Sequence, residues 1–97
     1  MTAARRRVEI VNAKGLHARA SRLFVITAAK FDATVTIRRD DLVVGADSVL
    51  SVLELAAPRG TEIEITAEGA EADAAVTALA ELVAAGFHED DAPAAEG

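Results

Sequence analysis

The 97-residue sequence contains no cysteine, tryptophan or tyrosine, and it has only three phenylalanines and two histidines. Without cysteine, disulfide frameworks, zinc ribbons, iron–sulfur clusters and thiol catalysis are excluded. No apolar run approaches the roughly 20 residues that a transmembrane helix needs. The first residues are rich in arginine but lack the apolar stretch of a secretory signal. We therefore expect a cytoplasmic protein that does not bind a membrane, and we expect no metal site.

Charge is distributed unevenly along the chain. Residues 1–39 carry nine arginines or lysines against two acidic residues, whereas residues 40–97 carry one arginine against fourteen acidic residues, and the net charge is −6. An acidic chain without aromatic residues interleaved among basic ones is a poor candidate for nucleic-acid binding. The basic first part could attract an anion or an acidic protein surface, or the division could serve only packing and solubility.

The apolar composition is sufficient for one small core. Leucine, isoleucine, valine and phenylalanine together number 26, which is about 27% of the residues and above the level typical of disordered chains. A chain of this length forms a single domain. We expect that domain to span residues 1–87 and to be followed by a disordered acidic tail over residues 88–97, in which His88 is solvated.

Two periodicities in the apolar residues predict the secondary structure. Alternation predicts strands at residues 6–12, 33–38, 42–44 and 61–67. Spacing of three and four predicts helices at residues 18–30, from 47 or 48 to about 56, and from 72 to about 85. This βαββαβα order favours an α+β fold, an open-faced β-sandwich in which a four-stranded, mainly antiparallel sheet is covered on one face by three helices.

His17 stands between a glycine turn and the first turn of a predicted helix, with Arg19 and Arg22 shortly after it. A helix N-terminus favours the neutral imidazole, which is the nucleophilic form. If this imidazole accepted a phosphoryl group, the helix N-terminus and the nearby guanidinium groups would stabilise the new anion. The pattern therefore points to reversible phosphoryl transfer, and the alternative is that His17 only caps the helix.

Residues 15–21, GLHARAS, resemble the active-site motif of HPr, the histidine-containing phosphocarrier of bacterial phosphotransferase systems. The resemblance covers roughly residues 8–86, including the segments DSVLSVLELAAPRG and TEIEITAEG. It implies that His17 carries the phosphoryl group on Nδ1 and that Arg19 contacts this group. It also implies that enzyme I, charged from phosphoenolpyruvate, is the donor, that enzyme IIA proteins are the acceptors, and that no bound cofactor is needed.

Two positions bear on the pathway and on regulation. Ala20 stands where the sugar-transport motif has proline, and in this it resembles carriers of regulatory, nitrogen-type systems. We therefore expect a regulatory carrier, with sugar uptake as the alternative. Ser48 matches the serine that HPr kinase/phosphorylase modifies in many relatives, but Asp47 beside it would repel a phosphate. A simple helix-capping role for Ser48 is an equal interpretation.

Partner docking is expected on the first two helices. The expected docking residues are Arg22, which follows His17 in the first helix, and four apolar residues of the short second helix: Val49, Leu50, Val52 and Leu53.

Two other functions compete with the carrier. One is a regulatory binding module controlled by Ser48 phosphorylation, in which His17 is vestigial. The other is a small hydrolase with His17 as general base, for which the nearest acids in sequence, Glu9 and Asp32, have no evident reason to converge on His17. We expect a monomeric phosphoryl carrier with a phosphohistidine intermediate, and not a stand-alone enzyme.

Overall fold

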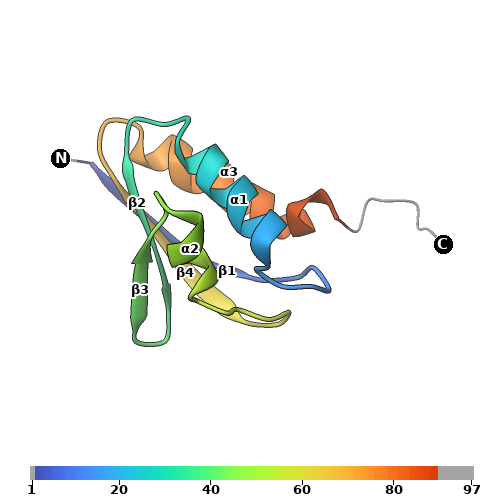
Figure 1. Cartoon of the computed structure of the whole chain (residues 1–97). Helices are drawn as coiled ribbons and strands as arrows, with labels where there is room; N and C mark the ends of the chain where they lie inside the picture. The colour runs from blue at the N-terminus through green and yellow to red at the C-terminus, as the bar shows by residue number, and fades with distance from the viewer. Residues whose placement is uncertain (1, 90–97) are drawn as a thin grey trace.

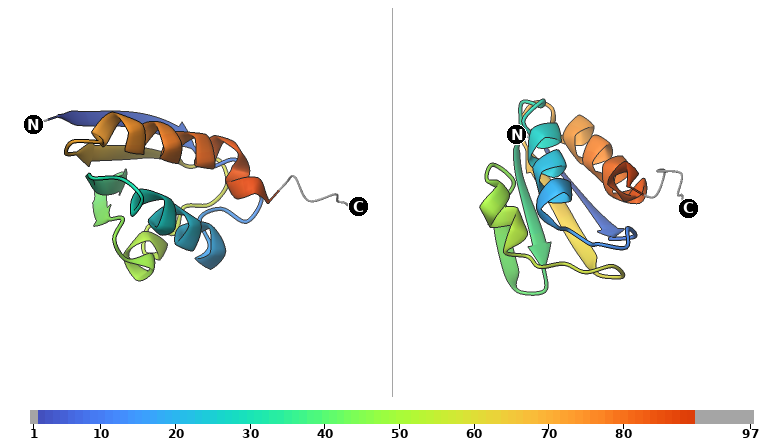
Figure 2. Two further views of the ribbon diagram at one scale, coloured as in Figure 1. Left: turned by 90° about the horizontal axis from the view of Figure 1, so that it is seen from above. Right: turned by 45° about the vertical axis from the view of Figure 1, so that its right-hand side comes forward.

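The computed structural model describes residues 2–89, which form one sheet with helices on one of its faces (Figures 1 and 2). Within these residues the strands follow the spatial order β1-β4-β2-β3, and every neighbouring pair is antiparallel. The strands are β1 (Ala3–Glu9), β2 (Thr34–Arg39), β3 (Leu42–Gly45) and β4 (Glu62–Glu68). The helices are α1 (Ala18–Ala28), α2 (Val49–Leu53), α3 (Ala72–Ala84) and a short 3-10 helix, η1 (Gly86–His88). The predicted open-faced sandwich is confirmed.

Strand β4 lies at the centre of the sheet because it pairs with β1 on one side and β2 on the other. Ile65 stands opposite Arg6 of β1 and Ile37 of β2. The alternating isoleucines of β4, Ile63 and Ile65, are fully buried beneath the helices. Their period of two selects which face of the strand is buried and thereby fixes the register of the sheet.

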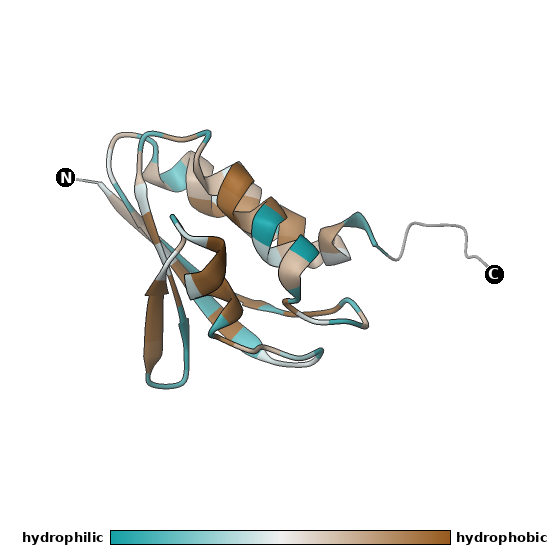
Figure 3. Cartoon of the chain, viewed as in Figure 1, coloured by the Kyte–Doolittle hydropathy of each residue, from teal (hydrophilic) through white to brown (hydrophobic). Residues whose placement is uncertain are grey.

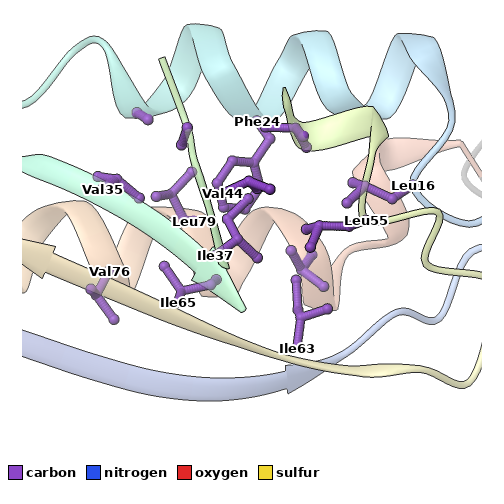
Figure 4. Packing of buried hydrophobic residues seen from close by; sticks show 14 of the residues in the cluster. Leu16, Phe24, Val35, Ile37, Val44, Leu55, Ile63, Ile65, Val76 and Leu79 are labelled. Carbon is purple, nitrogen blue, oxygen red and sulfur yellow. The ribbon is translucent and has the colours of Figure 1, made fainter. Parts of the chain in front are cut away.

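The core lies between the sheet and the helices (Figure 4). Phe24 of α1 and Leu79 of α3 are both 0% exposed, and they meet the isoleucines of the sheet. Phe87 of η1 is also buried in this cluster. Two of the three phenylalanines are thus buried, and the other buried members of the cluster are aliphatic.

The opposite face of the sheet is polar and carries an ionic cluster. The carboxylate of Glu64 on β4 lies 3.3 Å from Arg38 on β2, and 3.9 Å and 4.0 Å from Arg7 and Arg5 on β1. The cluster therefore ties the central strand to both neighbours. Figure 3 shows apolar residues along β3 and α2, and Leu42 and Val43 of β3 and Leu50 of α2 are among the exposed ones. Among residues 2–89, no helix has the length and apolar character needed to cross a bilayer.

Several predicted boundaries differ from the structure by one to three residues; the helix predicted to end at about residue 56, for example, ends at Leu53. Two of the differences lie at the ends of the domain. The first strand spans residues 3–9 instead of 6–12, because small Ala3 and Ala4 extend the pairing with β4 while Asn12 turns into the interior. The predicted tail starts too early, because His88 lies in η1 and Glu89 packs against the domain. Residues 90–97 of that predicted tail lie outside the described residues.

Gly15 brings two loops into close contact. Its φ is +67°, and a Cβ at this position would lie 2.5 Å from the carbonyl oxygen of Ala57 and 2.9 Å from Cα of Pro58. Gly60 also has a positive φ, +91°, but a Cβ there would meet nothing within 4 Å. A side chain at Gly60 would therefore meet backbone strain alone, whereas one at Gly15 would meet both backbone strain and a steric collision.

We expect Gly15→Ala to destabilise the fold more than Gly60→Ala. Gly60→Ala should lower the free energy of unfolding by about 1 kcal/mol through backbone strain. Gly15→Ala should cost about 2 kcal/mol more, because a methyl group is forced against fixed backbone atoms. Urea unfolding of both variants measures the difference, and equal losses would contradict the proposed collision.

Candidate functional site

His17 is the N-cap residue of α1, and the cap defines the state of its ring. Its Nδ1 accepts a hydrogen bond from the backbone N–H of Arg19 at 3.3 Å, and its carbonyl oxygen accepts the N–H of Ser21 at 2.8 Å. A ring nitrogen that accepts a hydrogen bond carries no proton. Nδ1 is therefore the unprotonated nitrogen, and it lies at the positive end of the α1 dipole.

The loop before α1 is held from two directions. The N–H of Leu16 donates to the carbonyl oxygen of Ala57 at 2.9 Å, in the segment that follows α2. The side-chain amide of Asn12, which is completely buried, donates to the carbonyl oxygen of Gly15 at 2.8 Å. These bonds fix the backbone immediately before His17.

Glu89 contacts the other nitrogen of the ring. One carboxylate oxygen lies against Nε2 of His17, and the other accepts a hydrogen bond from Asn12 Nδ2 at 2.9 Å. Burial acts to raise the pKa of the Glu89 carboxyl. Hydrogen bonds from Asn12 and His17, together with electrostatic attraction to His17 and Lys14, outweigh burial and leave that pKa below its ordinary value.

Arg19 and Arg22 are exposed and three residues apart, which makes them neighbours on the surface of α1. The backbone of Arg19 contacts His17, but its guanidinium group forms no ion pair within residues 2–89. The side chain is thus available to an incoming anion. The structure places His17, Arg19 and Arg22 in one region, as the sequence predicts.

Ser48 is the N-cap residue of α2, and its hydroxyl oxygen accepts the N–H of Ser51 at 3.4 Å. The predicted capping role is therefore confirmed, and Asp47 is exposed beside it. One predicted docking residue is wrong: Val52 is 0% exposed, because it faces the core, so no partner can contact it. Leu50, in contrast, is 74% exposed.

Sequence reasoning missed Asn12 and Glu89 as members of the site. Asn12 falls within the strand predicted over residues 6–12, and Glu89 falls within the predicted acidic tail. The useful signal is Phe87 directly after Gly86, because an apolar residue beyond a glycine cap commonly packs back onto the helix. That packing turns the chain and brings Glu89 to His17.

Comparisons with known proteins agree with this site. The chain matches the family model PTS-HPr, described as "PTS HPr component phosphorylation site", over residues 4–85. It is 43% identical to the phosphocarrier protein NPr of Shewanella violacea, with 92% of this chain and 98% of that protein covered. It is 39% identical to the phosphocarrier protein HPr of Neisseria meningitidis serogroup A, over 87% of this chain and 94% of that protein.

The fold agrees as well. The crystal structure of HPr-C-His from Thermoanaerobacter tengcongensis superposes with a TM-score of 0.83 at 35% identity, covering 92% of this chain and 98% of that one. The family model spans most of the domain that carries His17, and the relatives are similar over nearly their whole length. The chain therefore belongs to the HPr family of phosphocarrier proteins of the phosphotransferase system.

Proposed function

We propose that the protein is a cytoplasmic, monomeric carrier that takes a phosphoryl group from phospho-enzyme I onto Nδ1 of His17 and passes it to enzyme IIA proteins. The observation that carries this proposal is the state of the His17 ring. Nδ1 accepts the N–H of Arg19 and therefore presents an electron pair at the start of α1.

The transfer follows from this geometry. The Nδ1 electron pair attacks phosphorus in line with the leaving atom of the donor, a nitrogen–phosphorus bond forms, and the donor atom keeps the electrons of the bond that breaks. The N–H of Arg19 is released by Nδ1 and becomes free to donate to a phosphoryl oxygen. The exposed guanidinium of Arg19 supplies a charge-assisted hydrogen bond to the same group. Because the same groups serve both states of His17, the transfer is reversible.

A regulatory, nitrogen-type system is the pathway that we propose. Two observations support it: Ala20 follows Arg19 where the sugar-transport motif has proline, and the chain is similar to an NPr protein. The comparable similarity to HPr proteins supports sugar uptake as the second candidate.

The proposed docking surface comprises Arg22, Val49, Leu50 and Leu53. Helices α1 and α2 pack against each other, which joins the two parts of this surface. Leu50 projects into solvent, and Val49 and Leu53 are half-buried beside it. An apolar surface next to a basic residue suits a partner with an apolar patch and acidic rim.

Ser48 is proposed as a secondary, regulatory site at the edge of this surface. Its hydroxyl is half-buried and is occupied in capping α2. A phosphate there would break the cap bond and add negative charge beside Asp47, which would weaken docking of acidic partners.

We expect His17→Ala to abolish phosphorylation, because it removes the only proposed acceptor. The assay mixes the protein with enzyme I from a related bacterium, magnesium and labelled phosphoenolpyruvate. The label on the unsubstituted protein should be labile in acid and stable in base. Since His88 is the other histidine, His88→Ala should keep the label. Label on the His17→Ala protein, or none on the unsubstituted protein while a control HPr is charged, would refute the proposal.

We expect Leu50→Ala to weaken docking without changing the chemistry at His17. The KM of enzyme I for this protein should rise about fivefold, because an exposed apolar anchor is typically worth about 1 kcal/mol or more in an interface. Val43→Ala is the matched control, since Val43 is 55% exposed but lies on β3 opposite Arg38 of the polar sheet face. Steady-state transfer kinetics distinguish them, and equal KM values for both variants would place docking elsewhere.

A further inference from the structure

We propose that Glu89 is a positioning residue for His17: its carboxylate holds the imidazole in the tautomer in which Nδ1 is unprotonated, and keeps the proton on Nε2 during transfer. The proposal rests on the proposed role of His17 as phosphoryl acceptor. It gives a role to the segment that follows α3. That segment takes no part in the transfer step described above.

The ring of His17 is constrained at both nitrogens. Nδ1 accepts the Arg19 N–H, while Nε2 lies against a carboxylate oxygen of Glu89. A neutral imidazole has one N–H, and an ionised carboxylate can only accept. The single proton therefore sits on Nε2, and the two contacts together select one tautomer. The pair is largely shielded from water, with 27% and 13% of the His17 and Glu89 side chains exposed.

The backbone that delivers Glu89 is strained. Gly86, Phe87 and His88 have φ values of 64°, 56° and 64°, so two non-glycine residues in succession are left-handed. Such conformations persist only where the surrounding structure enforces them, and they concentrate at functional sites. Here the buried Phe87 side chain, 1% exposed, anchors the turn in the core. The turn reverses the chain beyond α3 and returns Glu89 to the start of α1.

Asn12 fixes the orientation of the carboxylate. Its Nδ2 donates both to Gly15, in the loop before His17, and to the Glu89 oxygen that does not face the ring. The Asn12 side chain is fully buried, and its Oδ1 has no partner within residues 2–89. Both groups that face Nδ2 are acceptors, so turning the amide over would place Oδ1 against two oxygens. Both oxygens of Glu89 are thus required as acceptors, one for Asn12 and one for His17.

This arrangement serves the onward transfer. When phospho-His17 gives up its phosphoryl group, the nitrogen–phosphorus bond breaks and its electrons return to Nδ1. If Nε2 keeps its proton, the leaving group is a neutral imidazole; if Nε2 has lost it, the leaving group is the far more basic imidazolate. A carboxylate beside Nε2 balances the positive charge of the protonated, phosphorylated ring, in the way that a buried aspartate supports the histidine of a serine protease.

The test replaces Glu89 with an isosteric group that cannot accept at both positions. In Glu89→Gln one of the two terminal atoms is an NH₂ group, so it opposes a donor at either Asn12 or His17. Glu81→Gln is the matched control, because it removes the same charge from an exposed position on α3. Nitrogen-15 NMR of the full-length proteins, above the pH at which the ring protonates, reports which His17 nitrogen bears the proton.

We expect the unsubstituted protein and Glu81→Gln to show a protonated Nε2 and an unprotonated Nδ1. Glu89→Gln should show the two ring signals moving toward each other as the other tautomer becomes populated. Transfer from the isolated phospho-protein to an enzyme IIA protein should slow about tenfold in Glu89→Gln, the loss expected for one charge-assisted hydrogen bond, and remain unchanged in Glu81→Gln. Glu89→Ala, which removes the polar group altogether, should show the same direction of change in both measurements.

Ring signals in Glu89→Gln and Glu89→Ala that match those of the unsubstituted protein would overturn the proposal. So would a change of equal size in Glu81→Gln, since it would reflect net charge alone. The NMR comparison needs no phosphoryl donor. If the unsubstituted protein takes no phosphate from enzyme I, the proposed function fails, while the ring signals still decide whether Glu89 positions His17.

Discussion

The close approach of Gly15 to the backbone at Ala57 and Pro58 is the contact on which the site depends. It allows the N–H of Leu16 to reach the Ala57 carbonyl oxygen, and it sets the entry of the chain into α1. The side chain of Arg39, in β2, also holds this segment, because it donates hydrogen bonds to the carbonyl oxygens of Leu55 and Ala56. His17 and α2 are therefore both next to this one contact between loops.

The site combines two segments that are far apart in the sequence but adjacent in the fold. The start of α1 exposes Nδ1 of His17, and the turn after α3 covers Nε2 with Glu89. A carrier protein needs no substrate pocket of its own, because each partner supplies half of the reaction site. What it must provide is a nucleophile of defined protonation and a surface to be recognised, and a small domain can provide both.

The fold was predictable because the spacing of apolar residues is regular in the strands and helices that form the core. Ile63 and Ile65 alternate strictly, and Phe24 lies on a stripe of helical spacing, so strand, helix and buried face followed from the pattern. His17 was predictable because a glycine turn, a histidine and an arginine meet at a helix start. Glu89 was not, because its place depends on burial of Phe87 and on two left-handed residues, neither of which leaves a periodic trace. Val52 was assigned to the wrong side because α2 is too short for its pattern to separate buried from exposed positions.

Because β4 lies between β1 and β2, a growing chain on the ribosome cannot close the sheet until residues 62–68 have emerged. Until then β1 has no partner strand, and β2 is paired with β3 on one edge only, because both β1 and the other edge of β2 pair with β4. Such long-range pairing slows folding. The Leu16 bond to Ala57 and the contact of Glu89 with His17 also form late. A prematurely terminated chain therefore contains His17 but lacks the contacts that hold this residue in the folded domain.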